Sequence, residues 1–272
     1  MKEQAINFGP AARLAGIVCE PDAGQSHINA PAVIVSNIGF HHRTAPFRLW
    51  VDLSRRLAAL GFTTLRFDTS GLGDSAARQD NQADSQVADT REAMAWLTER
   101  KKRGSFILLG LCSGTDAAHA LATTDARVVG AIFIDGYTYP TLKSRIIHHP
   151  LMRLFSHRHW SRLFRRIRLG VSRSEMESDE IFVRDYPTRE RMTRDVEAML
   201  GRGTKLLYVY TNDVEYMYNY TDQFYDMLAL PQLRGRIALE RYPEADHLFS
   251  LPDQRQRLQD RIAVFMSSHW SR

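Results

Sequence analysis

The stretch that decides the fold reads Leu108-Leu109-Gly110-Leu111-Cys112-Ser113-Gly114-Thr115-Asp116-Ala117-Ala118. An apolar run leads into glycine, one residue, cysteine, one residue and a second glycine, and an alanine-rich segment follows. This order is typical of a buried strand, a sharp turn and a helix, in which the turn holds one side chain at strained backbone angles. Glycines on either side relieve the crowding that a Cβ atom would cause. The stretch therefore predicts a nucleophile elbow with Cys112 at its tip.

The residue at the tip decides the chemistry of such a turn. The helix that follows directs free N–H groups and a partial positive charge at the Cys112 thiol, which favours the thiolate. Ser113 is the other candidate nucleophile, but it stands out of register between Gly110 and Gly114. We therefore predict that Cys112 is the nucleophile.

The rest of the chain alternates strands and helices around this turn. Apolar and β-branched runs predict strands at residues 4–8, 13–19, 32–35, 62–67, 105–111, 128–134, 206–210 and 237–242. Amphipathic segments predict helices at residues 47–60, 85–101, 113–123, 188–200, 218–228 and 252–269. Such alternation requires a mostly parallel sheet with helices on both faces. We expect one α/β domain over residues 1–272, with a cap insertion at about 137–187 that contains no convincing strand.

The composition narrows the class of protein. The chain has 272 residues, of which 44% are hydrophobic and 25% charged, and its formal net charge is +5. No apolar run reaches the ~18 residues of a membrane span, so we expect none. The first residues lack the apolar core of a secretory signal, and Cys19 and Cys112 form neither a disulfide framework nor a CxxC site. We therefore expect a cytoplasmic protein.

The positive charge is concentrated in the predicted cap. Residues 143–173 are rich in lysine, arginine and histidine and contain no acidic residue. A solvated helix face explains such a segment, and so would an acidic partner, a membrane surface or nucleic acid. Because no nucleic-acid module is recognisable, we expect no nucleic acid. Arginines that alternate with apolar side chains between residues 153 and 168 suit a lid over an acyl group, or a dock for an acyl carrier protein or coenzyme A.

A cysteine nucleophile needs a base, and the base needs an orienting acceptor. In a parallel sheet these groups come from loops at the carboxyl ends of strands. The loop after the last predicted strand contains His247, and the loop after the preceding strand contains Asp213 and Glu215. We predict that His247 is the base and Asp213 the acid, with Glu215 as the alternative acid.

An acyl-transfer site also needs two N–H donors for the oxyanion. One is expected at Ser113, directly after the nucleophile, and the other in the loop after the strand at 32–35, where Ile38 is the first choice and Gly39 the second. Asp68 and Asp74 are interpreted as structural turn residues. The sequence contains no phosphate-binding glycine loop, so we expect no cofactor. His41, His42 and His119 are candidate metal ligands, but they do not have the spacing of a metal site, so we expect no metal.

Together these motifs resemble the α/β-hydrolase superfamily over nearly the whole chain. Residues 110–114, the stretch 68–75 and Ala245-Asp246-His247 match its patterns. Cysteine at the elbow is similar to the dienelactone hydrolase group. Residues 37–43, followed by Pro46, resemble hydrolases found beside bacterial exopolysaccharide and natural-product pathways. The resemblance implies an eight-stranded sheet, acyl-enzyme chemistry and a cap domain.

The expected function is cleavage of an ester, lactone or thioester through an acyl-Cys112 intermediate. Amides are disfavoured, because cysteine would be the better leaving group. One alternative is an acyltransferase or cyclase that passes the acyl group to a bound amine or alcohol. The alternative of another class is a non-catalytic binding protein with the same fold. The expected partner is a small acyl substrate, free or carried by coenzyme A or an acyl carrier protein; the acyl group, the acceptor and the oligomeric state stay open.

Overall fold

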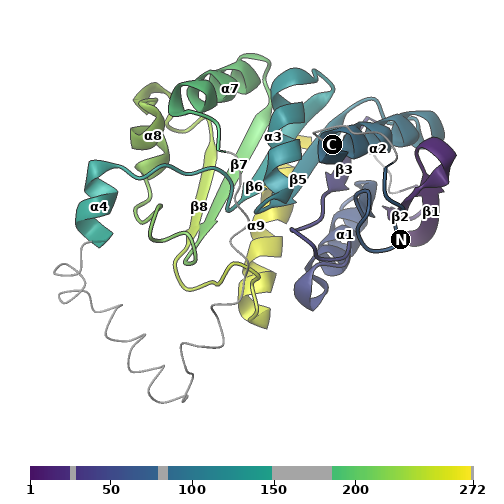
Figure 1. The fold of residues 1–272 in the computed structure, drawn as a ribbon. Helices are drawn as coiled ribbons and strands as arrows, with labels where there is room; N and C mark the ends of the chain where they lie inside the picture. The colour runs from purple at the N-terminus through teal and green to yellow at the C-terminus, as the bar shows by residue number, and fades with distance from the viewer. Residues whose placement is uncertain (25–28, 79–84, 149–185, 271–272) are drawn as a thin grey trace.

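The computed structural model describes residues 1–24, 29–78, 85–148 and 186–270, which contain one eight-stranded sheet (Figure 1). Its strands are β1 (Lys2–Phe8), β2 (Leu14–Glu20), β3 (Ala32–Val35), β4 (Thr64–Phe67), β5 (Phe106–Leu111), β6 (Val128–Ile134), β7 (Lys205–Thr211) and β8 (Ala238–Tyr242). They lie in the order β1-β2-β4-β3-β5-β6-β7-β8. β2 is antiparallel to β1 and β4, whereas β3 to β8 pair in parallel. The prediction of a mostly parallel eight-stranded sheet is confirmed.

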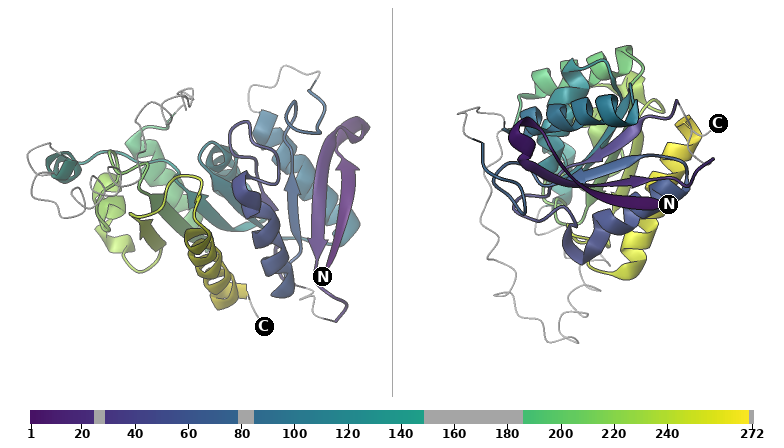
Figure 2. Two further views of the ribbon diagram at one scale, coloured as in Figure 1. Left: turned by 90° about the horizontal axis from the view of Figure 1, so that it is seen from below. Right: turned by 90° about the vertical axis from the view of Figure 1, so that its right-hand side faces the viewer.

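Helices cover both faces of this sheet (Figure 2). One face packs against α1 (Leu49–Ala59) and α9 (Pro252–Trp270), which contact each other. The other face carries α2 (Ser85–Lys101), α3 (Gly114–Thr124), α7 (Arg189–Gly201) and α8 (Gln223–Leu228). Short 3₁₀ turns lie at Pro10–Ala12, Pro46–Arg48 and Pro231–Leu233. The result is the three-layer arrangement that alternating strands and helices require.

The central strands show why the layers form. β5 is buried along its whole length, and its side chains alternate between two hydrophobic cores. Phe106 and Leu108 face the core beneath α2 and α3, whereas Ile107 and Leu109 face the core beneath α1 and α9. A strand that is covered on both faces needs apolar residues at every position, which the run before the elbow supplies.

Two predicted segments differ from the structure or fall partly outside it. The helix predicted to begin at residue 218 begins at Gln223, because the backbone N–H of Asn219 donates to the Gln223 side chain across a turn. Of the predicted cap insertion at 137–187, residues 149–185 lie outside the described residues, and so does most of the basic stretch 143–173. The part that the structure describes contains α4 (Leu142–His148).

Within the described ranges, no helix combines the length and apolar character needed to cross a membrane.

The loops that carry the candidate site residues follow β3, β5, β6, β7 and β8. Because these five strands are parallel, their carboxyl ends meet at one edge of the sheet, where α/β proteins bind their ligands.

Candidate active site

The elbow has the strained backbone that its sequence predicts. Cys112 directly follows β5 with a positive φ of 55°, and its N–H donates to the Ile134 carbonyl at 2.9 Å. A Cβ atom on Gly110 would lie 2.2 Å from the Gly114 carbonyl oxygen, a distance that no side chain tolerates. The glycine spacing therefore lets strand and helix approach closely enough to present the cysteine at the tip of the turn.

His247 connects the cysteine to a carboxylate. Its ring Nδ1 lies 2.7 Å from Oδ2 of Asp135, and its side chain also hydrogen-bonds the Cys112 thiol. With Nδ1 bound to the carboxylate, Nε2 is the ring atom that meets the sulfur. The structure thus brings Cys112, His247 and Asp135 together in one hydrogen-bonded line.

Asp135 is held by the strand next to it. It directly follows β6 at a positive φ of 48°, and its side chain is 0% exposed. The N–H of Thr211 at the end of β7 donates to Oδ1 at 2.7 Å, and the Thr211 hydroxyl donates to Oδ2 at 2.6 Å. A buried carboxylate requires such donors, and here they also fix its direction toward the imidazole.

The prediction that Asp213 orients the His247 ring is wrong. Asp213 is exposed, and its Oδ2 accepts the backbone N–H of His247 at 2.8 Å instead of the ring. Glu215, the alternative acid, forms an ion pair with Arg241 at 3.5 Å. Strand order along the chain points to the loop after β7, whereas the carboxylate that contacts the His247 ring directly follows β6. A signal was present in the sequence, since Asp135 follows an apolar run as directly as any other candidate follows its strand.

Electrostatics favour a charged imidazole. Burial of the His247 ring opposes protonation, but the hydrogen bonds and charges of Asp135 and Cys112 outweigh it and raise the pKa of His247 to about 10. Although Asp213 is partly exposed, partial desolvation of its carboxylate raises the pKa of Asp213, against the opposing effects of the His247 N–H and charge. At neutral pH the site is therefore suited to a thiolate–imidazolium pair at the start of α3.

The loop after β3 lies against the other side of the elbow. A Cβ atom on Gly114 would come 2.5 Å from the Asn37 carbonyl oxygen, and the N–H of Gly39 donates to the Ser113 hydroxyl at 2.9 Å. Ile38 lies between these two contacts. Its N–H, like that of Ser113, donates to no atom of the residues that the structure describes. The N–H groups of Ile38 and Ser113, which are predicted to bind the oxyanion, thus belong to segments that contact each other. The N–H of Gly39, the second choice, already donates to the Ser113 hydroxyl.

The other singled-out residues have structural partners. Asp68 accepts the backbone N–H groups of Arg43 at 2.6 Å and Asp74 at 3.1 Å, as expected of a turn residue. His42, Asp68 and Asp74 offer ligand atoms within 4.8 Å of one another, but the Arg43 guanidinium ion-pairs both carboxylates and disfavours a cation there. Nε2 of His119 lies 2.9 Å from Asp195.

Comparisons with solved structures show the same fold. An esterase from Pyrococcus furiosus is 12% identical with a TM-score of 0.61, and the match covers 98% of this chain and 90% of that one. An α/β serine hydrolase without a lid from Xanthomonas campestris is 16% identical with a TM-score of 0.57, covering 99% and 95%. An α/β serine hydrolase homologue from Coxiella burnetii is 14% identical with a TM-score of 0.56, covering 99% and 97%.

Sequence comparison agrees with the fold. No curated protein matches this sequence at a significant level. A model of the α/β hydrolase family, by contrast, matches residues 33–261, which include the elbow cysteine, its histidine and the buried aspartate. The match over most of the length and the shared architecture show that this chain belongs to the α/β hydrolase family.

Proposed function

We propose that this hydrolase cleaves a thioester, ester or lactone through an acyl-Cys112 intermediate, with His247 as base and Asp135 as the acid that orients it. One observation carries the proposal: the His247 ring is hydrogen-bonded to Asp135 on one side and to the Cys112 thiol on the other. This is the arrangement that activates a nucleophile and later protonates a leaving group.

The reaction would proceed in two halves. The Cys112 thiolate attacks the carbonyl carbon, a carbon–sulfur bond forms, and the carbonyl electron pair moves to oxygen. The intermediate then collapses, and the leaving thiolate or alkoxide takes the proton of the His247 imidazolium. In the second half His247 removes a proton from water, the resulting hydroxide displaces the cysteine, and the carboxylic acid leaves.

The N–H groups of Ile38 and Ser113 would stabilise the oxyanion of each tetrahedral intermediate. Both are backbone donors beside the elbow that have no partner among the described residues. Removing one donor from such a site typically raises the barrier by about 3 kcal/mol. The preference for thioesters follows from the nucleophile, because a leaving thiol matches the basicity of the attacking thiolate.

The same intermediate also supports the second candidate, transfer of the acyl group to a bound amine or alcohol. A thioester reacts with amines more readily, relative to water, than an oxygen ester does. Lys143 and Arg145 on α4 are exposed and suit the phosphate of coenzyme A or of a carrier protein. Mass spectrometry of the products, with and without acceptors, separates transfer from hydrolysis.

The cytoplasm remains the expected location of the protein.

The proposal is tested by trapping the acylated protein. Intact-mass measurement with a panel of acyl thioesters and lactones should show one acyl adduct, which peptide mapping places on Cys112. Cys112→Ala should lose both adduct and turnover. Cys19→Ala is the matched control, because Cys19 is the only other cysteine and is buried in β2. Full turnover by Cys112→Ala would refute the mechanism, whereas a wild-type protein that shows neither adduct nor turnover would favour a binding protein with this fold.

A further inference from the structure

The side chain of Asn37 holds the loop that follows β3. Its Nδ2 donates to the His41 carbonyl at 2.6 Å and to Oδ1 of Asp68 at 3.1 Å, and its Oδ1 accepts the N–H of Thr69 at 2.8 Å. Asn37 is 1% exposed, so none of these contacts competes with bulk water. The amide therefore connects both ends of its own loop to the loop after β4.

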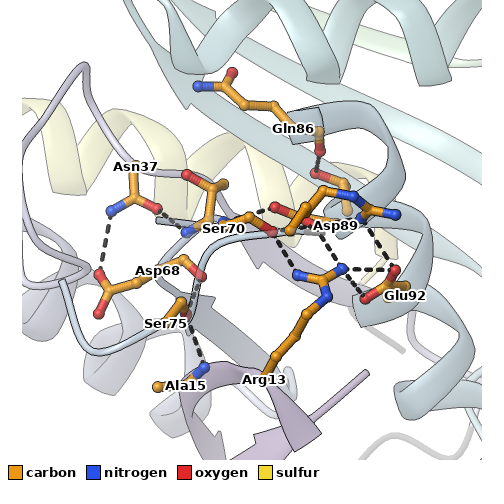
Figure 3. Close-up of polar contacts among 12 residues, drawn as sticks. Arg13, Ala15, Asn37, Asp68, Ser70, Ser75, Gln86, Asp89 and Glu92 are labelled. Atoms are coloured by element: carbon orange, nitrogen blue, oxygen red, sulfur yellow. Dashed lines mark hydrogen bonds and ion pairs between the residues drawn. The ribbon is translucent and has the colours of Figure 1, made fainter. Parts of the chain in front are cut away.

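The loop after β4 is itself anchored from the opposite side. Both the N–H and the hydroxyl of Ser70 donate to Asp89 of α2, at 2.7 and 2.8 Å, and Arg13 of the β1–β2 turn donates to the same carboxylate at 2.9 Å (Figure 3). Thr69 and Ser70 are neighbours, so successive N–H groups are bound by Asn37 and by Asp89. Asn37 thus bonds to a segment that the rest of the fold keeps in place.

Ser113 holds the same loop from the elbow. Its hydroxyl accepts the N–H of Gly39 at 2.9 Å, and it is 3% exposed. Ile38 therefore stands between two anchored neighbours. The peptide plane that carries the Ile38 N–H starts at the Asn37 carbonyl, which rests on Gly114 at the start of α3. Fixing Asn37 and Gly39 fixes the direction of this N–H relative to Cys112.

We propose that Asn37 and Ser113 are positioning residues for the oxyanion site: together they hold the Ile38 N–H where the tetrahedral oxyanion forms. This inference rests on the proposed function. It assigns the Ser113 side chain a role of its own, separate from the backbone N–H that the same residue contributes. A preorganised donor is effective because it needs no reorganisation during the reaction. A more mobile loop should therefore slow the acylation of Cys112, even though the Ile38 N–H is still present.

The inference separates two reactions of the same thiol. Acylation of Cys112 builds negative charge on a carbonyl oxygen and depends on the oxyanion donors. Alkylation by iodoacetamide displaces iodide at a saturated carbon and depends only on the thiolate. A positioning role predicts that the variants lose the first rate and keep the second.

The experiment compares Ser113→Ala, Asn37→Ala and wild type in single-turnover acylation by an activated thioester and in alkylation by iodoacetamide at the same pH. We expect acylation to fall about 10- to 100-fold in each variant, while alkylation stays within about 2-fold. Ser113→Thr keeps a hydroxyl and should restore acylation. Thr123→Ala, which removes a hydroxyl further along α3, is the matched control and should change neither rate.

Wild-type acylation rates in both Ala variants would overturn the inference, and so would an equal fall in acylation and alkylation, because that pattern means the nucleophile itself has moved. Ser113→Ala keeps the test valid if Asn37→Ala fails to fold. Failure of the wild type to acylate with the whole panel would instead refute the proposed function, and is recognised before any variant is compared.

Discussion

The ends of β6 and β7 each place an aspartate beside His247, and the two are used differently. Asp135 at the end of β6 is buried and accepts from the ring, whereas Asp213 after β7 is exposed and accepts from the backbone. Asp135 also receives two hydrogen bonds from Thr211. Burial and pre-aligned donors, rather than order along the chain, decide which carboxylate serves the imidazole.

The difference has a simple electrostatic basis. A carboxylate that is excluded from water interacts strongly with a nearby imidazolium, because little solvent screens the pair. Asp213 retains contact with water, so its charge is screened and its contact with the His247 N–H serves to shape the loop. The two positions can therefore be separated by experiment.

The largest effect is expected for Asp135→Asn. The amide keeps the size of the side chain but removes the charge that stabilises the imidazolium and fixes the ring tautomer, so kcat/KM should fall about 10²- to 10³-fold. A cysteine nucleophile should suffer less than a serine would, because the ion pair is partly formed before reaction. Steady-state kinetics on an activated thioester measure the loss. A larger loss in Asp213→Asn would reverse the assignment.

Thr211→Val should have the next largest effect. The substitution keeps the shape and the backbone N–H but removes the hydroxyl that donates to Oδ2 of Asp135. We expect kcat/KM to fall about 10-fold, since the loss of a hydrogen bond to a charged group is typically about 1.5–3 kcal/mol and about 1.4 kcal/mol corresponds to a factor of ten in rate. Thr211→Ser keeps the hydroxyl and should stay near wild type. A loss in Thr211→Ser with wild-type activity in Thr211→Val would show that the methyl group matters and the hydroxyl does not.

The pH dependence of stability distinguishes the two carboxylates without a substrate. Because the pKa of His247 is raised to about 10, its imidazolium stabilises the folded state fully below pH 6.5, and this contribution is lost as the pH rises toward 10. Asp135→Asn should flatten that decline and Asp213→Asn should leave most of it. Urea unfolding between pH 6 and 10, taken as the difference from wild type, cancels the other titrating groups. Parallel curves for all three proteins would contradict the role of Asp135.

Asp213→Asn should show the smallest effect. Its amide oxygen can still accept the N–H of His247, so we expect kcat/KM within about 5-fold of wild type at neutral pH. Because the pKa of Asp213 is raised, the wild-type side chain protonates at a less acidic pH than an ordinary aspartate and then resembles the variant. The two activities should therefore converge as the pH falls. A ratio that widens toward low pH would argue against this.

The sequence predicted those parts of the molecule that depend on local patterns. The strands at 32–35 and 128–134 match β3 and β6, because each is a continuous apolar run that must be buried. Thr188 is the N-cap of α7, as its residue type indicates, and accepts the Arg191 N–H at 3.3 Å. The predicted start of α8 at residue 218 is too early, because Tyr218 is buried in the loop before the helix and continues the apolar pattern.

The candidate site was predictable only in part, for a related reason. The glycine pattern fixes the elbow, and the end of the last strand fixes His247. The acid depends on how far each strand end lies from the histidine in space and on which donors surround it. Both depend on the lateral order of strands and on Thr211, which no local pattern contains.

The proposed acid, Asp135, directly follows β6, and this position has a consequence for how the protein can change. The loop after β7 contacts the His247 backbone through the Asp213 side chain, and beyond it Tyr216 is exposed. Under the proposed assignment, the segment at 214–217 does not hold the acid. A substitution at the exposed Tyr216 can therefore change substrate preference while the hydrogen bonds among Cys112, His247 and Asp135 stay intact.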